Sequence, residues 1–266
     1  MLLAQVSDLH VCAPGRTLGG GVDTPAMAEA CVQALLALRP APQALLLSGD
    51  LVDAGGPAEY AHLQRLLQPL PWPLYPVAGN HDERGALREA FGTRMGPHSA
   101  LMPDFLQYAA DLGPLRLLVL DTVVPQRPHG ALCARRLAWL DERLREDDRP
   151  VLIALHHPPF ATGIAHMDAM GLLEGAEALE DLVRRHPRVQ ALLCGHVHRS
   201  IQTRFGGAVA SVCPSPAHQI ALNLLGQGDD GFTLEPPGFQ LHLWHAQRLV
   251  SHTVPVGDHG GTRPFA

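Results

Sequence analysis

Residues 2–10 read Leu-Leu-Ala-Gln-Val-Ser-Asp-Leu-His, an apolar run that ends on Asp8 and His10. Four later apolar runs also end on residues whose side chains bind metals. These endings are Gly49-Asp50, Gly79-Asn80-His81-Asp82, His156-His157 and Gly195-His196-Val197-His198. In open α/β sheets the carboxyl ends of buried strands lie together, and ligands bind there. The five endings therefore predict an α/β fold with one shared metal site at its strand ends.

The ligand types select the metal. The candidate ligands offer carboxylate, amide and imidazole donors, and they are Asp8, His10, Asp50, Asn80, His156, His196 and His198. This mixed nitrogen and oxygen set suits Fe, Mn, Co or Zn. No cysteine lies within the five endings, and Cys194 precedes Gly195, so an iron–sulfur cluster or a structural thiolate zinc is not expected.

Seven such ligands predict a two-metal hydrolytic centre, which needs one ligand shared by metals ~3.5–4 Å apart. Asp50 is the candidate for this bridge, because Gly49 allows close backbone approach. Residues two apart in a strand point to the same face, so Asp8 and His10 are expected to converge, as are His196 and His198. Two carboxylates against two dications leave a charge of about plus two, which attracts a phosphate ester.

Each ending alone is weak evidence. A Gly-Asp pair after an apolar run is also an ordinary turn signal, so the prediction depends on all five endings in order. The chain has 16 histidines, and those without a motif are treated as ordinary residues. They include His62, His98, His129, His186, His242, His245, His252 and His259.

On these residues the chain resembles the calcineurin-like metallophosphoesterases, whose pattern is Asp-x-His, Gly-Asp, Gly-Asn-His, His and Gly-His-x-His. The resemblance extends over residues 7–198 and fills all seven ligand positions. Within that superfamily the chain is most similar to the bacterial class III cyclic nucleotide phosphodiesterases and the related glycerophosphodiesterases. The stretches 49–55, 156–159 and 213–219 carry this closer similarity.

The resemblance implies a four-layer α/β/β/α sandwich and assigns the ligands. One metal is held by Asp8, His10, Asp50 and His198, and the other by Asp50, Asn80, His156 and His196. Beside the metals, Asn80, His81 and His218 are the candidate substrate contacts, and His81 is the candidate acid for the leaving alkoxide. The alternatives are that His81 and His218 are ordinary hydrogen-bonding histidines. Asp53 and Asp82 are expected to orient ligands or loops.

The implied activity is hydrolysis of small phosphodiesters by a hydroxide that bridges the metals, with 3′,5′-cyclic AMP as the leading substrate. A glycerophosphodiesterase, a broad-specificity phosphodiesterase and a catalytically silent metal-binding regulator remain open. Protein serine/threonine phosphatases are disfavoured, because Ala54-Gly55 stands where they carry Arg-Gly and Asp82 where they carry Glu. Lipid-A pathway pyrophosphatases typically have arginine in place of His81, and the related nucleases carry added DNA-binding domains.

Composition bounds the partners. The formal charge of −6 provides no electrostatic attraction for a nucleic acid polymer or an anionic membrane. No apolar run approaches ~20 residues and no signal peptide is visible. Five cysteines without paired spacing are typical of reduced thiols in a cytoplasmic protein. All 20 basic residues are arginine, which excludes lysine Schiff-base chemistry.

The pattern predicts one domain over residues 1–266. Strands are expected at 2–7, 44–48, 74–78, 106–110, 115–121, 151–156 and 189–194, and helices at 24–38, 57–67, 83–91, 134–145 and 172–185. Thr24 is the expected cap of the first helix. After residue 198, strands at 201–205, 208–213, 219–224, 240–244 and 249–254 are expected to form the second sheet. The loop 226–238 is a candidate lid or oligomer contact, and a homodimer or larger homo-oligomer is expected.

Overall fold

Two β-sheets form the centre of the computed structural model, which describes residues 1–92, 95–261 and 263–265. The first sheet, in the order β16-β15-β1-β2-β3, is built from β1 (Leu2–Val6), β2 (Ala44–Leu47), β3 (Leu74–Pro76), β15 (Gly238–His245) and β16 (Arg248–Pro255). The second, in the order β11-β12-β10-β8-β6-β5-β4, is built from β4 (His98–Ser99), β5 (Tyr108–Asp111), β6 (Arg116–Val119), β8 (Val151–Ala154), β10 (Val189–Cys194), β11 (Ile201–Phe205) and β12 (Ala208–Val212). Two small sheets pair β7 (Gly130–Ala131) with β9 (Leu172–Glu174) and β13 (Gln219–Ile220) with β14 (Phe232–Thr233).

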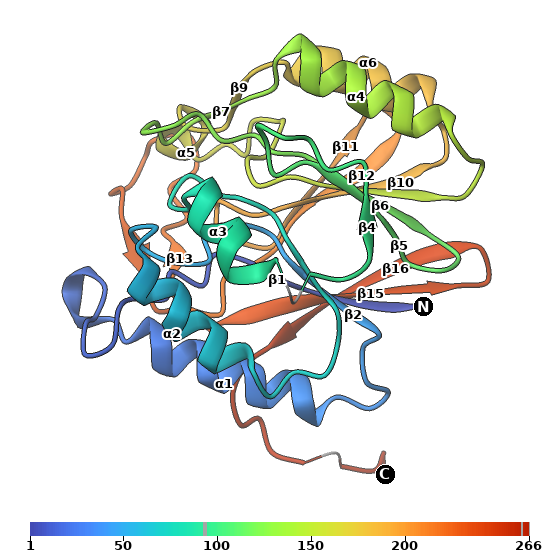
Figure 1. Cartoon of the computed structure of the whole chain (residues 1–266). Coiled ribbons are helices and arrows are strands. Elements are labelled where there is room, and N and C mark those ends of the chain that lie inside the picture. Colours follow the sequence, from blue (N-terminus) through green and yellow to red (C-terminus); the bar gives the residue numbers. More distant parts are fainter. Residues whose placement is uncertain (93–94, 262, 266) are drawn as a thin grey trace.

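Helices cover both outer faces of the paired sheets (Figure 1). The helices are η1 (Gly19–Gly21), α1 (Thr24–Ala37), α2 (Pro57–Leu67), α3 (Arg84–Phe91), α4 (Ala134–Arg145), α5 (Ala165–Asp168) and α6 (Ala176–Arg185). In Figure 1, α4 and α6 lie on one side of the sheets, and α1 and α2 lie on the other. This is the four-layer α/β/β/α sandwich that the family resemblance implies, and the expectation is confirmed.

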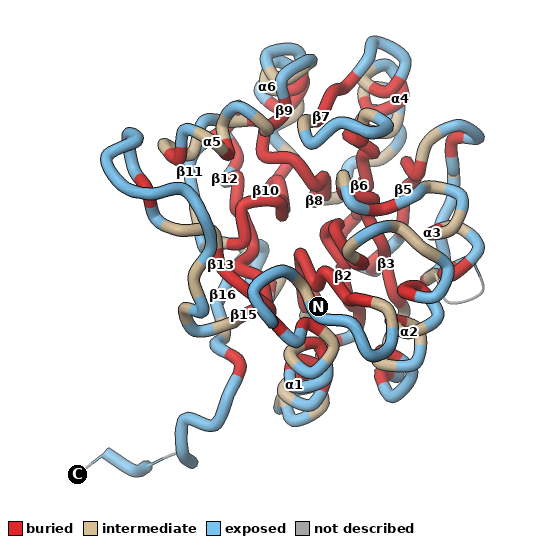
Figure 2. The backbone as a smooth tube through the Cα atoms, turned by 90° about the vertical axis from the view of Figure 1, so that its left-hand side faces the viewer, coloured by how far each residue is buried: buried red, intermediate tan, exposed pale blue. Residues whose placement is uncertain are grey.

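The inner strands β6, β8 and β10 of the second sheet are buried on both faces. Leu117 and Val119 of β6 pack in the core between the sheets, whereas Leu118 packs in a second core with Leu140 of α4 and Leu179 of α6. This alternation explains why β6, β8 and β10 are continuous apolar runs. Figure 2 shows the same division, with buried strands at the centre and exposed outer sides on the helices.

The starts of two helices and the cap of a third differ from the prediction, and α3 begins at Arg84, one residue after its expected start. The helix expected over 172–185 begins at Ala176, because Gly175 adopts a left-handed conformation with φ of 84° and residues Leu172–Glu174 form strand β9 instead. The cap of α1 is Asp23, whose carboxylate accepts a hydrogen bond from the Ala26 amide, and not Thr24. The Thr24 hydroxyl instead donates to the His10 carbonyl at 2.6 Å.

The sequence predicts that all the strands after residue 198 form the second sheet, and this prediction is wrong. β15 pairs with β1, with Leu2 opposite Leu243, so β15 and β16 extend the first sheet. Only β11 and β12 join the second sheet. The strand expected over 219–224 ends at Ile220, which pairs with Phe232 of β14 inside the predicted loop. Sequence patterning identifies a strand but not the sheet edge that it joins.

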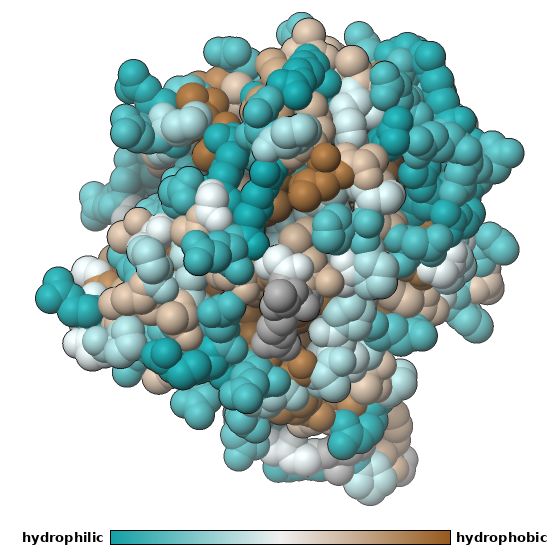
Figure 3. Space-filling model, viewed as in Figure 1, coloured by the Kyte–Doolittle hydropathy of each residue, from teal (hydrophilic) through white to brown (hydrophobic). Residues whose placement is uncertain are grey.

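The face of the molecule in Figure 3 is mostly hydrophilic, with hydrophobic side chains in small separate areas. Among the described residues, no helix combines the length and the hydrophobicity that a membrane crossing requires.

Candidate metal centre

The loops after β1, β2 and β10 turn through left-handed backbone conformations. Their positive φ angles are 55° at Asp8, 44° at His10, 49° at Asp50, 72° at His196 and 53° at His198. Such values are uncommon outside glycine and concentrate at functional sites. Asp8 and His10 converge, as predicted, but strand alternation is not the cause, because the four residues of that prediction lie beyond the ends of β1 and β10.

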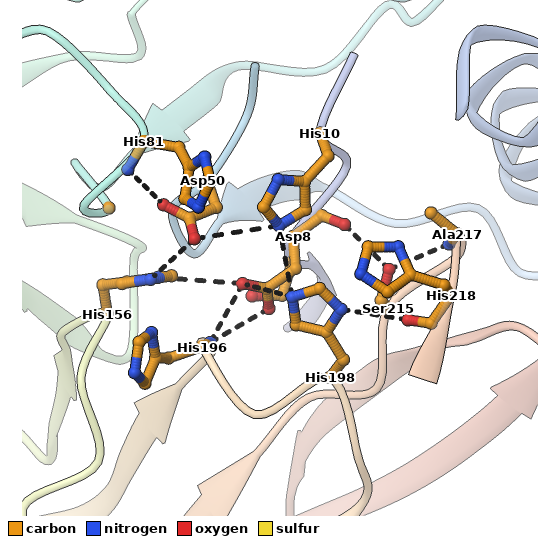
Figure 4. A network of polar contacts seen from close by, with 12 residues as sticks. Asp8, His10, Asp50, His81, His156, His196, His198, Ser215, Ala217 and His218 are labelled. Atoms are coloured by element: carbon orange, nitrogen blue, oxygen red, sulfur yellow. Dashed lines mark hydrogen bonds and ion pairs between the residues drawn. The ribbon is translucent and has the colours of Figure 1, made fainter. Parts of the chain in front are cut away.

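One ligand cluster contains Asp8, His10 and His198 (Figure 4). The His198 Nδ1 atom lies 3.0 Å from the carbonyl oxygen of His218, so in the neutral ring Nδ1 carries the hydrogen and Nε2 presents its lone pair. That Nε2 atom lies 3.2 Å from His10 Nε2 and 3.5 Å from Asp8 Oδ1. The His10 ring is also 3.7 Å, at Nε2, from Asp50 Oδ2.

The second cluster is built around His156. Its Nδ1 atom lies 2.9 Å from the carbonyl oxygen of Ser48, so the hydrogen sits on Nδ1 and Nε2 again presents a lone pair. That Nε2 lies 3.2 Å from Asn80 Oδ1 and 3.3 Å from Asp50 Oδ2. Asp50 thus faces a histidine of each cluster, as its predicted bridging position requires.

His196 and His157 lie beside His156 but differ in what their rings offer. The His196 ring is 5.1 Å from that of His156, and its buried Nε2 has no hydrogen-bond partner among the described residues. Both nitrogens of His157 are engaged, by the Thr122 hydroxyl at 2.7 Å and the Pro128 carbonyl at 3.0 Å. His196 is therefore free to bind a metal, whereas His157 supports the loops around it. The expectation that His196 and His198 converge is wrong, because each of them joins a different cluster.

Both clusters suit a cation. In each, lone pairs of nitrogen and oxygen face one another at contact distance, an arrangement that is repulsive unless a positive charge lies between them. Burial disfavours the imidazolium of His156, yet Asp50 and Asp8 raise its pKa to about 9. Burial also raises the pKa of Asp8 to about 6, with Asp50 adding to this effect and His156 opposing it. The donor types and this demand for positive charge fit a pair of divalent metal ions.

His81 occupies the rim of the site. Its backbone N–H donates to Asp50 Oδ1 at 2.9 Å, and its Nδ1 lies 2.6 Å from the Asp53 carbonyl oxygen. The side chain is 40% exposed, and its ring stands edge-on to His10 at 4.7 Å. Asp53 Oδ1 is 3.7 Å from His10 Nδ1 and 3.9 Å from His81 Nδ1, so this carboxylate lies beside both rings.

The segment 213–219 reaches the site from the other side. The Ser215 hydroxyl donates to the Asp8 carbonyl at 2.7 Å and accepts from the Ala217 amide at 2.8 Å. The His218 ring lies 4.5 Å from that of His198 and 5.1 Å from that of Phe232. Burial lowers the pKa of His218 to about 4, so its ring is neutral near pH 7.

Asp82 supports the loops and does not enter the cavity, in line with the expectation that it orients them. Its carboxylate accepts hydrogen bonds from the amides of Gly79 and Leu51 and from the hydroxyl of Tyr60. Those contacts tie the loop that carries Asn80 to the loop that carries Asp50.

The backbone of Gly49 lies close to the ring of His156, and a substitution can test whether this close approach is required. A Cβ atom there would lie 2.3 Å from His156 Nδ1, and its φ is already +96°. We expect Gly49→Ala to lower the free energy of unfolding by ~2–5 kcal/mol, because left-handed strain and overpacking add. Urea denaturation in the presence of a chelator measures this loss without any contribution from metal binding.

Gly15 provides the matched control for that measurement. Its φ is +76°, and an added Cβ would meet nothing within 4 Å. Gly15→Ala should therefore cost only the left-handed strain, ~1–2 kcal/mol. Equal losses in the two variants would show that the approach of Gly49 to His156 is not tight.

A cavity of about 240 Å³ lies over the two clusters. Its lining includes eight of the residues that the sequence singled out as ligands, substrate contacts or orienting groups: His10, Asp50, Asp53, Asn80, His81, His196, His198 and His218. It further includes Leu18, Pro128, Met167, Met170 and Ile220, which sequence reasoning missed, since apolar residues in loops carry no motif. Of the described residues, none within 226–238 lines the cavity, although Phe232 touches His218.

A four-layer fold with two cation-binding clusters at its strand ends defines a metal-dependent phosphoesterase, and comparison with known proteins agrees. Residues 1–200 match the calcineurin-like phosphoesterase family, so the chain belongs to that family.

Relatives with related activities match nearly the whole chain. A probable glycerophosphodiester phosphodiesterase of Arcobacter nitrofigilis is 35% identical, over 100% of this chain and 97% of the relative. A probable cyclic nucleotide phosphodiesterase of Synechococcus is 37% identical, over 92% of this chain and 90% of the relative. The 3′,5′-cyclic adenosine monophosphate phosphodiesterase of Pseudomonas aeruginosa is 31% identical, over 97% and 91%.

A solved structure shares the fold. The dimetal phosphatase from Danio rerio superposes with a TM-score of 0.72 at 15% identity and covers 96% of this chain and 98% of its own. At that identity the likeness supports the architecture alone.

Proposed function

We propose that this chain hydrolyses small phosphodiesters at a pair of metal ions. The observation that carries the proposal is that Asp50 lies between two cation-binding clusters, with His81 beside it. Relatives named as cyclic nucleotide or glycerophosphodiester phosphodiesterases support the reaction class.

We assign Asp8, His10, Asp50 and His198 to one metal and Asp50, Asn80, His156 and His196 to the other. When bound, two divalent ions supply an activated water and neutralise the charge of the phosphoryl oxygens. Fe, Mn, Co and Zn all suit these donors. The ring tautomers of His156 and His198 are fixed by backbone carbonyls, so both present Nε2 without rearrangement.

His81 is the residue that we assign to proton transfer. The Asp53 carbonyl accepts its Nδ1–H and the Asp53 carboxylate lies beside it, so the ring is held at the cavity, and Nε2 is the atom that we assign to passing a proton to a leaving alkoxide. Asn80 and His218 line the same cavity and are assigned to substrate contact.

The leading substrate is a 3′,5′-cyclic nucleotide such as cyclic AMP, and the alternative is a glycerophosphodiester. Both appear in the names of relatives that match most of the chain. A catalytically silent metal-binding regulator is the alternative of a different class.

One assay tests the proposal. The chain stripped of metal should not release p-nitrophenolate from bis(p-nitrophenyl) phosphate, and added Mn²⁺ should restore release because the ligand clusters refill. His252→Ala, which removes an exposed histidine far from the motif positions, should behave as the unchanged chain and control for adventitious metal binding. Two bound Mn²⁺ ions without turnover would instead support the silent regulator.

We further propose that residues 1–266 act as one domain and assemble as a homodimer or larger homo-oligomer. The formal charge of −6 supports a small substrate over a nucleic acid polymer or an anionic membrane surface. The cytoplasmic location stays a prediction.

A further inference from the structure

The cavity lining has two chemically different parts. One part carries the imidazole and carboxylate groups of the metal clusters, together with His81 and His218. The other part is apolar and is formed by Leu18, Pro128, Met167, Met170 and Ile220, which we call the apolar wall. These five residues come from four segments far apart in the sequence, so only the fold brings them together.

The two methionines lie on a well-anchored segment. The Asp168 carboxylate accepts hydrogen bonds from the Thr162 amide and hydroxyl, both at 2.7 Å, and from the Gly163 amide at 2.9 Å. The Met170 amide donates to the Met167 carbonyl at 2.9 Å. These bonds close the turn around α5 and hold Met167, which is 5% exposed, against the cavity.

The same segment reaches the metal cluster. The backbone of Met170 lies next to the ring of His196, whose Nε2 has no hydrogen-bond partner among the described residues. A substrate phosphate held near His196 therefore has its substituent next to Met170. The apolar wall is in this way fixed relative to the reacting centre.

The charges around the cavity disfavour an anionic substituent. No arginine is among the described residues that line it, and the chain contains no lysine. An anionic group beyond the metals would have no counter-charge, and a polar head group would lose water against the wall without gaining hydrogen bonds. A flat apolar ring would bury surface there, and methionine sulfur makes favourable contacts with aromatic rings.

We propose that the apolar wall seats a flat, uncharged ring of the substrate, such as a nucleobase, and that Met167 and Met170 determine this specificity. The proposal rests on the proposed phosphodiesterase function. It predicts that a cationic head group such as ethanolamine is accepted poorly, although the Asp53 carboxylate stands at the cavity.

The test compares two ligands that differ by the ring. AMP and inorganic phosphate are used as competitive inhibitors of bis(p-nitrophenyl) phosphate hydrolysis by the Mn²⁺-loaded full chain. AMP should bind more tightly than phosphate by ~10-fold or more, as expected for a base against an apolar or aromatic surface. Met170→Gln should remove most of this preference and change the phosphate constant little. Met170→Leu, which keeps an apolar side chain, should retain it.

Met27→Gln is the matched control, because Met27 is also half-buried but lies in α1, away from the cavity. It should leave both inhibition constants unchanged. In the substrate arm, kcat/KM for cyclic AMP should fall ~10-fold in Met170→Gln, whereas kcat/KM for glycerophosphoethanolamine should hold.

An unchanged ratio of AMP to phosphate affinity in Met170→Gln would overturn the proposal, as would a wild-type preference for glycerophosphoethanolamine over cyclic AMP. If the wild type cleaves no diester, the proposed function fails instead. Calorimetric titration of AMP and phosphate into the Mn²⁺-loaded chain then still decides whether the wall binds the ring.

Discussion

Asp50→Ala should abolish activity more completely than the loss of any ligand that serves one metal. Its Oδ2 lies 3.3 Å from His156 Nε2 and 3.7 Å from His10 Nε2, so the substitution removes a donor from both clusters. It also removes the acceptor of the His81 amide. Because a catalytic metal stabilises the transition state by several kcal/mol, we expect kcat/KM to fall by ~10³-fold or more.

The comparison variants are His10→Ala and His198→Ala, each of which removes a ligand from one cluster only. Bound Mn²⁺ is counted by metal analysis after dialysis, and activity is measured on bis(p-nitrophenyl) phosphate. Asp50→Ala should retain less metal than either comparison variant. Two retained metals together with higher activity than His10→Ala would contradict the bridging assignment.

His81→Ala should separate proton transfer from metal binding. The ring is at the rim, 40% exposed, and its side chain is held by Asp53 and not by the ligand clusters. Both metals should therefore remain bound. For substrates with an alkoxide leaving group, such as cyclic AMP, kcat should drop by ~10²–10⁴-fold if His81 acts as a general acid.

The size of that loss should depend on the leaving group. Release of p-nitrophenolate needs no proton, so kcat for bis(p-nitrophenyl) phosphate should fall much less. An equal loss for both substrates would mean that His81 only contacts the phosphoryl oxygens. Loss of metal from His81→Ala would return the residue to a structural role.

The regular elements follow from local sequence. The predicted boundaries of α2, α4 and β10 agree with the structure to the residue, because helical periodicity and continuous apolar runs are local signals. The helix predicted from residue 172 begins late because Gly175 adopts a left-handed conformation, which the periodicity of the apolar residues does not report. The placement of β15 beside β1 depends on partners more than 230 residues apart, such as Leu2 and Leu243.

The sequence by itself determined which side chains gather at the site, since each candidate ligand ends an apolar strand and parallel strands end at one edge. The family resemblance implied how they divide into two clusters around Asp50, and only the tertiary structure shows the geometry of that division. Left-handed turns at Asp8, His10, His196 and His198 set the directions of the side chains, and strand alternation did not. Motif analysis of the sequence likewise could not identify the apolar wall, because its residues, such as Leu18 and Met170, belong to no motif. Their shared role comes only from long-range packing across the cavity.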